Sequence, residues 1–201
     1  MAKQPTTEKG RATRRRILQA ASRLIAERGV DQVSLEDVER EAGVGRSQLY
    51  HYFDGRDDLL RAVIDTTTDA VLGAQDGLLG DLGSLEAIDR WFDGLVALQD
   101  ERGARGGCPI GSLVGQLAER DEETRTALVS GFERWEKPLV AGLARMQERG
   151  RLRRDASVRE LADVTMAAIQ GGLLLTQVRR DPGQLRRALD GARAVLAAAV
   201  V

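Results

Sequence analysis

The sequence predicts an all-α protein with a small N-terminal domain, residues 1–62, and a larger helical domain, residues 63–201. Hydrophobic residues make up 42% of the chain but aromatic residues only 3%, a composition that favours packed helices. Apolar residues recur at helical spacing, and no segment shows the alternation of a half-buried strand. Glycine and proline residues fall between these periodic segments, where helices are expected to end or begin.

Three helices are expected in the N-terminal domain. The first covers about residues 11–28, with a stripe of apolar residues on one face. Ser34 begins the second helix, because its hydroxyl and the Asp37 carboxylate have the spacing of a capping box. A third helix covers about residues 46–52, after a short turn that contains Gly43 and Gly45. This short Gly-containing turn gives the second and third helices the dimensions of a helix-turn-helix.

Positive charge is concentrated at the start of a chain whose net charge is only −1. Residues 1–28 carry a local charge of +6. Such an arm gains free energy beside phosphates, because it releases their condensed counterions; the alternative is a solvated tail that favours solubility. The basic residues are Lys3, Lys9, Arg11, Arg14, Arg15, Arg16, Arg23 and Arg28.

The larger domain is expected to contain only helices and loops. A long helix follows Arg56, and the Gly-rich stretch at residues 73–83 is the expected linker between the domains. Further helices are expected at residues 85–99, from Pro109, at 124–150, at 157–180 and from Asp181-Pro182 onward. Pro138 should kink the helix at residues 124–150, and residues 102–107 form a flexible loop.

Several function classes are excluded by residue counts. One cysteine and one histidine allow no disulfide within the chain and no His/Cys zinc site, and the sequence has no nucleophile elbow or phosphate-binding Gly loop. We therefore expect no catalytic residue, no metal and no cofactor. The charged N-terminus lacks a signal peptide, and the longest uncharged stretch, residues 164–178, is too short to span a bilayer. A cytoplasmic protein without a membrane partner is expected.

Residues 29–63 resemble the DNA-binding domain of TetR-family repressors. The resemblance rests on Ala42-Gly43-Val44, on the run from Leu49 to Phe53 (Leu-Tyr-His-Tyr-Phe) and on Leu59. With the basic segment before it, the resemblance covers about residues 10–63. The chain departs from the family pattern at Gly45, Ser47 and Arg56, where Ser, Gly and Lys are usual. These differences affect which DNA sequence is read.

The resemblance implies that double-stranded operator DNA is a partner. It assigns Arg46 to guanine, Gln48 to adenine and the helix start at Ser34 to a phosphate. The resemblance implies a phosphate contact for His51, and the alternative is a surface residue without a role. A metal site at His51 is not expected, because no second type of ligand lies at a useful spacing. The candidate DNA-binding residues are Arg14, Ser34, Arg46, Ser47, Gln48, Tyr50, His51 and Arg56.

The larger domain is similar to the LmrA/YxaF-like branch of TetR regulators. The similar segments are residues 107–111 (Gly-Cys-Pro-Ile-Gly), 170–175 and 179–182. This resemblance implies a homodimer formed through the last two helices and a cavity for a small hydrophobic effector. The candidate cavity residues, each of which could equally be ordinary core, are Trp91, Phe92, Leu95, Leu113, Leu117, Phe132, Trp135, Met146, Met166 and Leu174. The candidate dimer-interface residues are Ile169, Gly172, Leu173, Leu185, Leu189 and Leu196.

The resemblance thus predicts a non-enzymatic regulator in which a three-helix DNA-binding domain precedes a ligand-binding and dimerisation domain. Two recognition helices would lie roughly 34–36 Å apart on a palindromic operator. An effector would shift the helix after Arg56 and move Arg46 out of register, with Pro138 and the 102–107 loop as places of motion. Gene activation and a helical protein that reads no DNA are the alternatives at this point.

Cys108 allows a second interpretation. It precedes Pro109 at an expected helix start, where the helix dipole would lower the pKa of the thiol. An electrophile- or redox-sensing regulator acting through Cys108 is therefore the alternative function. A small buried residue is the simpler explanation, because the chain contains no second cysteine to resolve an oxidised thiol.

Overall fold

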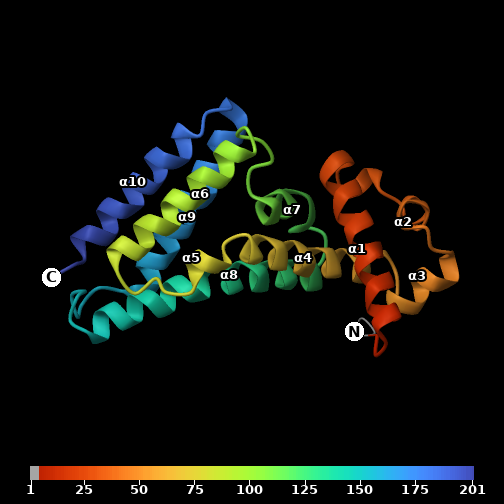
Figure 1. Cartoon of the computed structure of the whole chain (residues 1–201), viewed down its shortest axis with the longest axis horizontal. Helices are drawn as coiled ribbons and strands as arrows, with labels where there is room; N and C mark the ends of the chain where they lie inside the picture. The colour runs from red at the N-terminus through yellow and green to blue at the C-terminus, as the bar shows by residue number, and fades with distance from the viewer. Residues whose placement is uncertain (1–4) are drawn as a thin grey trace. The chain divides into compact units, whose positions relative to one another are not determined.

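The computed structural model describes residues 5–201, and the regular elements in this range are all helices. They run from the basic N-terminal segment to the C-terminus in the order that Figure 1 shows. Their bounds are α1 (Glu8–Arg28), the 3-10 turn η1 (Val30–Gln32), α2 (Leu35–Ala42), α3 (Arg46–Tyr52), α4 (Arg56–Gly73), α5 (Asp76–Leu79), α6 (Leu85–Glu101), α7 (Pro109–Leu117), α8 (Glu122–Glu148), α9 (Val158–Arg179) and α10 (Gly183–Ala198). The predicted all-α fold is confirmed.

Helix ends follow the local signals in the sequence. α1 begins three residues earlier than expected, because the Thr7 side chain accepts the Gly10 backbone N–H. The capping box at the start of α2 is present, with Ser34 and Asp37 bonding each other's backbone N–H groups. α10 begins at Gly183, with Pro182 at the N-cap position rather than in the first turn. A short helix, α5, lies within the stretch expected to be only linker.

The chain divides into two compact units. Unit 1 extends through Ala70 and includes Leu113–Gly131, while unit 2 comprises Val71–Ser112 and Phe132–Val201. The division thus differs from the expected boundary after residue 62. The reason is packing: Leu113, Leu117 and Leu128 are buried in the same core as α1–α4.

Unit 1 contains the helix-turn-helix. α1 packs against α2, and α2 contacts α3 after a turn at Gly43, whose φ of 61° is in the left-handed region that suits glycine. The core includes Ile17, Leu24, Val38 and Leu49, each buried. This core holds α3 with its apolar side inward and leaves the opposite side to solvent.

In unit 2, α10 packs closely along α9 and also contacts α6 (Figure 1). A Cβ atom added at Gly172 would lie 2.8 Å from Cδ1 and 3.1 Å from Cα of Leu185, so glycine allows the backbone of α10 to approach. This close approach explains a glycine in the middle of a helix.

One helix of the described residues, α9, is long and apolar enough to cross a membrane by length and composition alone. This is weak evidence, because a core helix passes the same test. Its inward residues, Ile169, Leu173 and Thr176 among them, are buried in unit 2. Packing against α10 therefore accounts for much of its apolar character.

Candidate nucleic-acid interface and ligand cavity

Helix α3 presents a polar face to solvent. Leu49 is completely buried and Tyr52 is buried beside it, which orients the helix. The predicted contact residues Arg46, Ser47, Gln48, Tyr50 and His51 are all exposed. Four of them, with Gly45 and Tyr52, border a shallow hollow in the surface: Ser47, Gln48, Tyr50 and His51. The face has the donors and acceptors that base edges and phosphates require.

Arg46 is held only loosely in the free protein. Its guanidinium lies 3.8 Å from the Glu36 carboxylate and 5.8 Å from the centre of the Tyr50 ring. Both the guanidinium and the carboxylate are well exposed. Because exposed ion pairs contribute little free energy, Arg46 can exchange these contacts for a guanine edge at small cost.

Arg56, one of the predicted DNA-binding residues, makes hydrogen bonds within unit 1, and its contact with DNA stays a prediction. Its Nη2 donates to the backbone oxygen of Val30 at 2.6 Å and, more weakly, to that of Val33 at 3.4 Å. The side chain is half-buried. Arg56 therefore ties the start of α4 to the connector between α1 and α2.

Gln116 binds the other backbone polar group of Val30. Its Oε1 accepts the Val30 N–H at 2.7 Å. The N–H and carbonyl of Val30 are thus bonded by side chains from α7 and α4, respectively. Because Val30 is buried, either backbone group would cost free energy without its partner. These two bonds position the connector that leads into the helix-turn-helix.

Ser34 and Arg14 are also engaged within unit 1. The Ser34 hydroxyl donates to Asp37 Oδ2 at 2.6 Å, and these hydrogen bonds from Ser34 lower the pKa of the Asp37 carboxyl. Arg14 lies with its guanidinium carbon 5.3 Å from the centre of the Phe53 ring, a cation–π contact. The predicted phosphate roles of Ser34 and Arg14 stay predictions.

The remaining basic residues of the N-terminal segment are mostly exposed on α1. Arg11 pairs with Glu8, and Arg23 pairs with Glu41. Arg15 and Arg16 are exposed and have no ion-pair partner among residues 5–201. Lys3 lies outside the described residues. The exposed arginines of α1 keep their charge available for phosphates.

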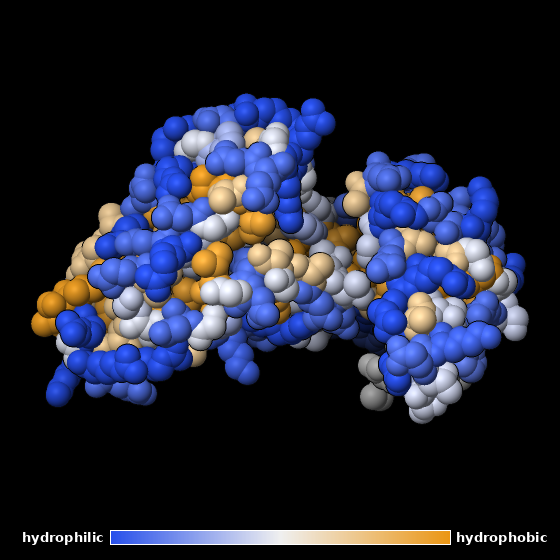
Figure 2. All heavy atoms as spheres, viewed as in Figure 1, coloured by the Kyte–Doolittle hydropathy of each residue, from blue (hydrophilic) through white to orange (hydrophobic). Residues whose placement is uncertain are grey.

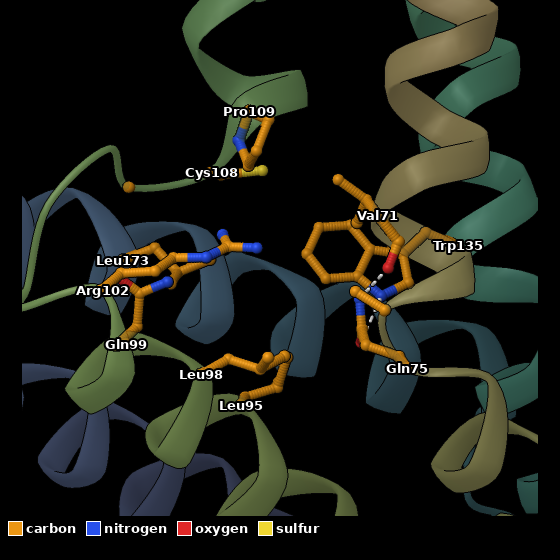
Figure 3. A pocket seen from close by; sticks show the side chains of 12 residues that line it. Val71, Gln75, Leu95, Leu98, Gln99, Arg102, Cys108, Pro109, Trp135 and Leu173 are labelled. Carbon is orange, nitrogen blue, oxygen red and sulfur yellow. Dashed lines mark hydrogen bonds between the residues drawn. The ribbon is translucent and has the colours of Figure 1, made fainter.

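Unit 2 contains a small cavity lined by both apolar and polar side chains (Figure 3). Its volume is about 30 Å³, room for roughly one or two water molecules. Apolar side chains from four helices, α4, α6, α8 and α9, include Val71, Leu95, Leu98, Trp135 and Leu173. The polar lining residues are Gln75, Gln99, Arg102 and Cys108.

Gln75 organises the aromatic side of this unit. Its Oε1 accepts the indole N–H of Trp91 at 2.8 Å and that of Trp135 at 3.1 Å, while its Nε2 donates to the Val71 carbonyl at 2.8 Å. All three side chains are buried. The amide oxygen therefore uses both of its acceptor positions, and these bonds fix Trp135 against the cavity.

Cys108 is buried at the start of α7. Its Sγ accepts the Gly111 N–H at 3.3 Å. Burial raises the pKa of the thiol, and this outweighs the bonds from Gly111 and Gln170, which act in the opposite direction. The helix start was expected to lower this pKa, and that expectation is wrong because desolvation dominates.

The predicted cavity residues are distributed over several places. Leu95 and Trp135 line the cavity. Trp91, Phe92, Met146 and Met166 belong to the core of unit 2, with Phe132 half-buried against it, and Leu113 and Leu117 belong to the core of unit 1. Leu174, by contrast, is 61% exposed on the surface of α9. Sequence periodicity identifies buried positions but not which of them border a void.

Most residues that line the cavity were not predicted for it, and among them are the polar residues Gln75, Gln99 and Arg102. Gln99 carried a usable signal, because it follows Leu95 by four residues and so falls on the apolar stripe of α6. A polar residue on such a stripe is unusual and indicates a site. Arg102 continues the same stripe one turn later.

The predicted dimer residues lie inside unit 2. Ile169, Gly172 and Leu173 on α9 and Leu185, Leu189 and Leu196 on α10 are all buried in the protomer. The exposed large apolar residues of these helices are Val164, Leu174, Leu175, Val178 and Val195. Figure 2 shows apolar atoms reaching the surface near the end of α10. The outward surface of both helices therefore uses different residues from those predicted.

A helix-turn-helix beside a basic helix, followed by a helical unit with a cavity, defines the class of DNA-binding transcriptional regulators. Comparison with known families agrees. The family profile of bacterial regulatory proteins, tetR family, matches residues 17–63, and that of the tetracyclin repressor-like C-terminal domain matches residues 84–192. The chain belongs to the tetR family, whose members are regulators rather than enzymes.

Individual relatives cover nearly the whole chain. An uncharacterised HTH-type transcriptional regulator from the lacX 3' region of Lactococcus lactis subsp. lactis is 30% identical, over 90% of this chain and 91% of that protein. The uncharacterised regulator YxaF of Bacillus subtilis strain 168 is 26% identical, over 84% and 87%. A TetR regulator structure from Chloroflexus aurantiacus has the same fold, with a TM-score of 0.80 and 19% identity over 96% and 98% of the two chains.

Proposed function

We propose that the protein is a dimeric, cytoplasmic repressor that releases a palindromic operator when a small, largely hydrophobic effector occupies the unit 2 cavity. The observation that carries this proposal is the solvent-facing polar surface of α3, held in place by buried Leu49. Exposed arginines on α1 support it, because they supply the non-specific attraction to phosphates. The repressor assignment draws on the family description of the C-terminal domain.

Dimerisation is supported by an apolar stripe along α9. Val164, Ala167, Gly171, Leu174 and Val178 follow one another at intervals of three or four residues, and all are exposed. Val178 is 73% exposed, which is unfavourable for a large apolar side chain in water. A second copy of the chain would cover this stripe in a symmetric interface.

Coupling between effector and DNA is supported by two continuous helices. α4 begins with Arg56, which binds the Val30 carbonyl, and its Val71 lines the cavity. α7 begins with Pro109, which lines the cavity, and its Gln116 accepts the Val30 N–H. An effector that displaces the cavity ends of these helices would disturb the connector before α2. It must bind the DNA-free form better to release DNA.

The test is a gel-shift assay with DNA from immediately upstream of the protein's own gene, in a salt series. We expect tight binding to one fragment, a steep loss with salt, and a loss of roughly 10- to 100-fold in Arg46→Ala, since one base contact is worth about 1–3 kcal/mol. Arg154→Ala, which removes an exposed arginine of unit 2, is the matched control and should bind normally. Equal binding to random DNA would contradict the proposal.

An electrophile sensor acting through Cys108 is the second candidate. Its support is that Cys108 lines the cavity. Burial of the thiol disfavours it, because the thiolate is the reactive form. Retained release of DNA in Cys108→Ser would count against a sensor, and complete loss of release would favour it.

A further inference from the structure

Two polar residues that line the unit 2 cavity, Gln99 and Arg102, have side-chain groups without a hydrogen-bond or ion-pair partner among residues 5–201. Gln99 is only 3% exposed, and its Oε1 is buried without a hydrogen-bond partner. A buried acceptor in this state costs free energy, and a ligand donor that reached it would remove that cost. The atom is covered in the free protein, so a bound molecule that presents an O–H or N–H group would reach it where the cavity widens.

Arg102 adds a positive charge beside Gln99. It directly follows α6 and lines the cavity, and no ion pair engages it within residues 5–201. Figure 3 shows its guanidinium extending below Cys108 toward the centre of the cavity. An anion would find both this charge and the positive end of α7, which begins at Pro109 in the cavity wall.

The spacing of these two residues sets the chemistry of the ligand. Gln99 and Arg102 are three residues apart at the end of α6, so their side chains are neighbours. A donor for Gln99 must therefore lie close to the acidic group that pairs with Arg102. An ammonium donor would be repelled by the guanidinium, which leaves a neutral donor, and a hydroxyl is the smallest that can stand beside a carboxylate. The remaining wall, with Leu95, Leu98 and Trp135, is apolar.

We propose that the effector is a small 2-hydroxycarboxylic acid with an apolar tail. Its carboxylate pairs with Arg102, its hydroxyl donates to Gln99 Oε1, and its tail packs against Leu95, Leu98 and Trp135. The neutral Cys108 thiol leaves this end of the cavity without a competing negative charge. The inference rests on the proposed function, because it names the effector class of the same cavity.

The size of the cavity explains how such a ligand would act. A volume of about 30 Å³ cannot hold a hydroxy acid of six carbons, so the walls must separate when it binds. Val71 of α4 and Pro109 of α7 belong to these walls. The ligand therefore selects a widened form of unit 2.

The test is isothermal titration calorimetry on the full-length, DNA-free protein. The probes are 2-hydroxy-4-methylpentanoate, 4-methylpentanoate without the hydroxyl, and 2-hydroxy-4-methylpentanamide without the charge. The variants are Arg102→Gln, Gln99→Met and the matched control Arg105→Gln, an exposed arginine of the same loop that does not line the cavity. Thermal unfolding of each variant checks that it is folded.

We expect the hydroxy acid to bind best and to lose roughly 10- to 100-fold in affinity in Arg102→Gln, but nothing in Arg105→Gln. Gln99→Met should remove the advantage of the hydroxy acid over 4-methylpentanoate while leaving the latter's affinity unchanged. Equal binding of the amide and the acid, equal effects of the two arginine substitutions, or no binding of any probe at millimolar concentration would overturn the inference.

A gel-shift arm separates this inference from the proposed function. Arg102-dependent binding of the hydroxy acid without release of DNA would refute the repressor mechanism and leave the ligand class standing. Release of DNA by a neutral compound that binds equally to wild type and Arg102→Gln would refute the ligand class and leave the repressor mechanism standing.

Discussion

Arg46 and Arg56 both belong to the motif that resembles a DNA-binding domain, yet the fold gives them different contacts. Arg46 is exposed on α3 and has only weak contacts, whereas Arg56 donates to two backbone carbonyls of the connector after α1. Gln75 and Gln99 differ in the same way, since the amide oxygen of Gln75 accepts two hydrogen bonds and that of Gln99 accepts none. The function of a polar residue therefore depends on which bonds the fold has already made.

Cys108 provides a prediction at the residue scale. Burial raises the pKa of its thiol, so the reactive thiolate is scarcer than in a free cysteine at the same pH. We expect iodoacetamide to alkylate the native protein more slowly than the urea-unfolded chain at pH 8. Mass spectrometry of timed samples measures both rates. The raised pKa also makes stability depend on pH. The protonated thiol contributes fully to the free energy of unfolding below the pKa of the unfolded chain, near 8.5. This contribution is lost as pH rises through the higher pKa of the folded protein.

A faster reaction in the native protein would contradict this prediction and would restore the sensor interpretation. The Cys108→Ser variant, which has no thiol, is the control for alkylation elsewhere.

At the scale of the helix, α9 shows how one segment has two apolar faces with different partners. Its inward face, with Gly172, packs against α10, while its outward face, with Gly171 and Leu174, is exposed. A Cβ atom at Gly171 would meet nothing within 4 Å. Adjacent glycines in one helix thus have different reasons to be there: one permits close packing, and the other lies on the outward stripe.

A closely packed glycine and a glycine with free space around it predict opposite effects of an alanine substitution. Gly172→Ala should lower the free energy of unfolding by about 1–2 kcal/mol, because the new methyl collides with Leu185 and Ala188. Gly115→Ala on α7, whose added Cβ atom would meet nothing within 4 Å, should raise it by up to about 1 kcal/mol through helix propensity. Urea unfolding followed by circular dichroism measures both. Equal shifts in the same direction would show that contact with α10 is irrelevant.

α7 provides a second prediction at the scale of the element. Gln116→Leu removes the acceptor of the buried Val30 N–H, so we expect a loss of about 1–3 kcal/mol in the free energy of unfolding and weaker DNA binding. Urea unfolding and the gel-shift assay measure the two effects. Gln19→Leu, at an exposed position of α1, is the control for unfolding and should be nearly neutral. Unchanged stability in Gln116→Leu would mean that α7 does not hold the connector.

At the scale of the whole molecule, the protomer consists of two units. Three helices, α4, α7 and α8, each begin in one unit and end in the other. The DNA-reading surface belongs to unit 1, and the cavity and outward apolar stripe belong to unit 2. A reader of palindromic DNA needs two copies of α3 at a set spacing. If this chain reads such DNA, as we propose, the dimer contact is as necessary for binding as the base contacts.

The exposed stripe predicts the effect of a charge at the dimer contact. Leu174→Glu places a carboxylate on the stripe, and two-fold symmetry would bring a second one near it, at a cost on the order of several kcal/mol. We expect a monomer by light scattering at micromolar concentration and a loss of operator binding. Val129→Glu, at an exposed apolar position of α8 that is 43% exposed, is the control and should stay dimeric. A dimeric Leu174→Glu protein would rule out this interface.

Much of the architecture could be predicted from local sequence. The helix types, the capping box at Ser34 and Asp37 and the exposed positions of α3 depend on residues near one another in the chain. The cavity could not be predicted in the same way, since only Leu95 and Trp135 of the expected residues line it. Its walls come from segments up to a hundred residues apart, and periodicity does not show which buried side chains leave a gap.

The sequence by itself determined the helical fold, the helix-turn-helix and its family, because these follow from short-range periodicity, caps and a compact motif. Only the tertiary structure decided that Arg56 and Gln116 hold Val30, that Gln99 lacks a partner and that the dimer residues expected on α9 and α10 face inward. The physical reason is that each of these depends on which distant surfaces meet. Packing, unlike helix formation, is a property of pairs of segments that no single segment encodes.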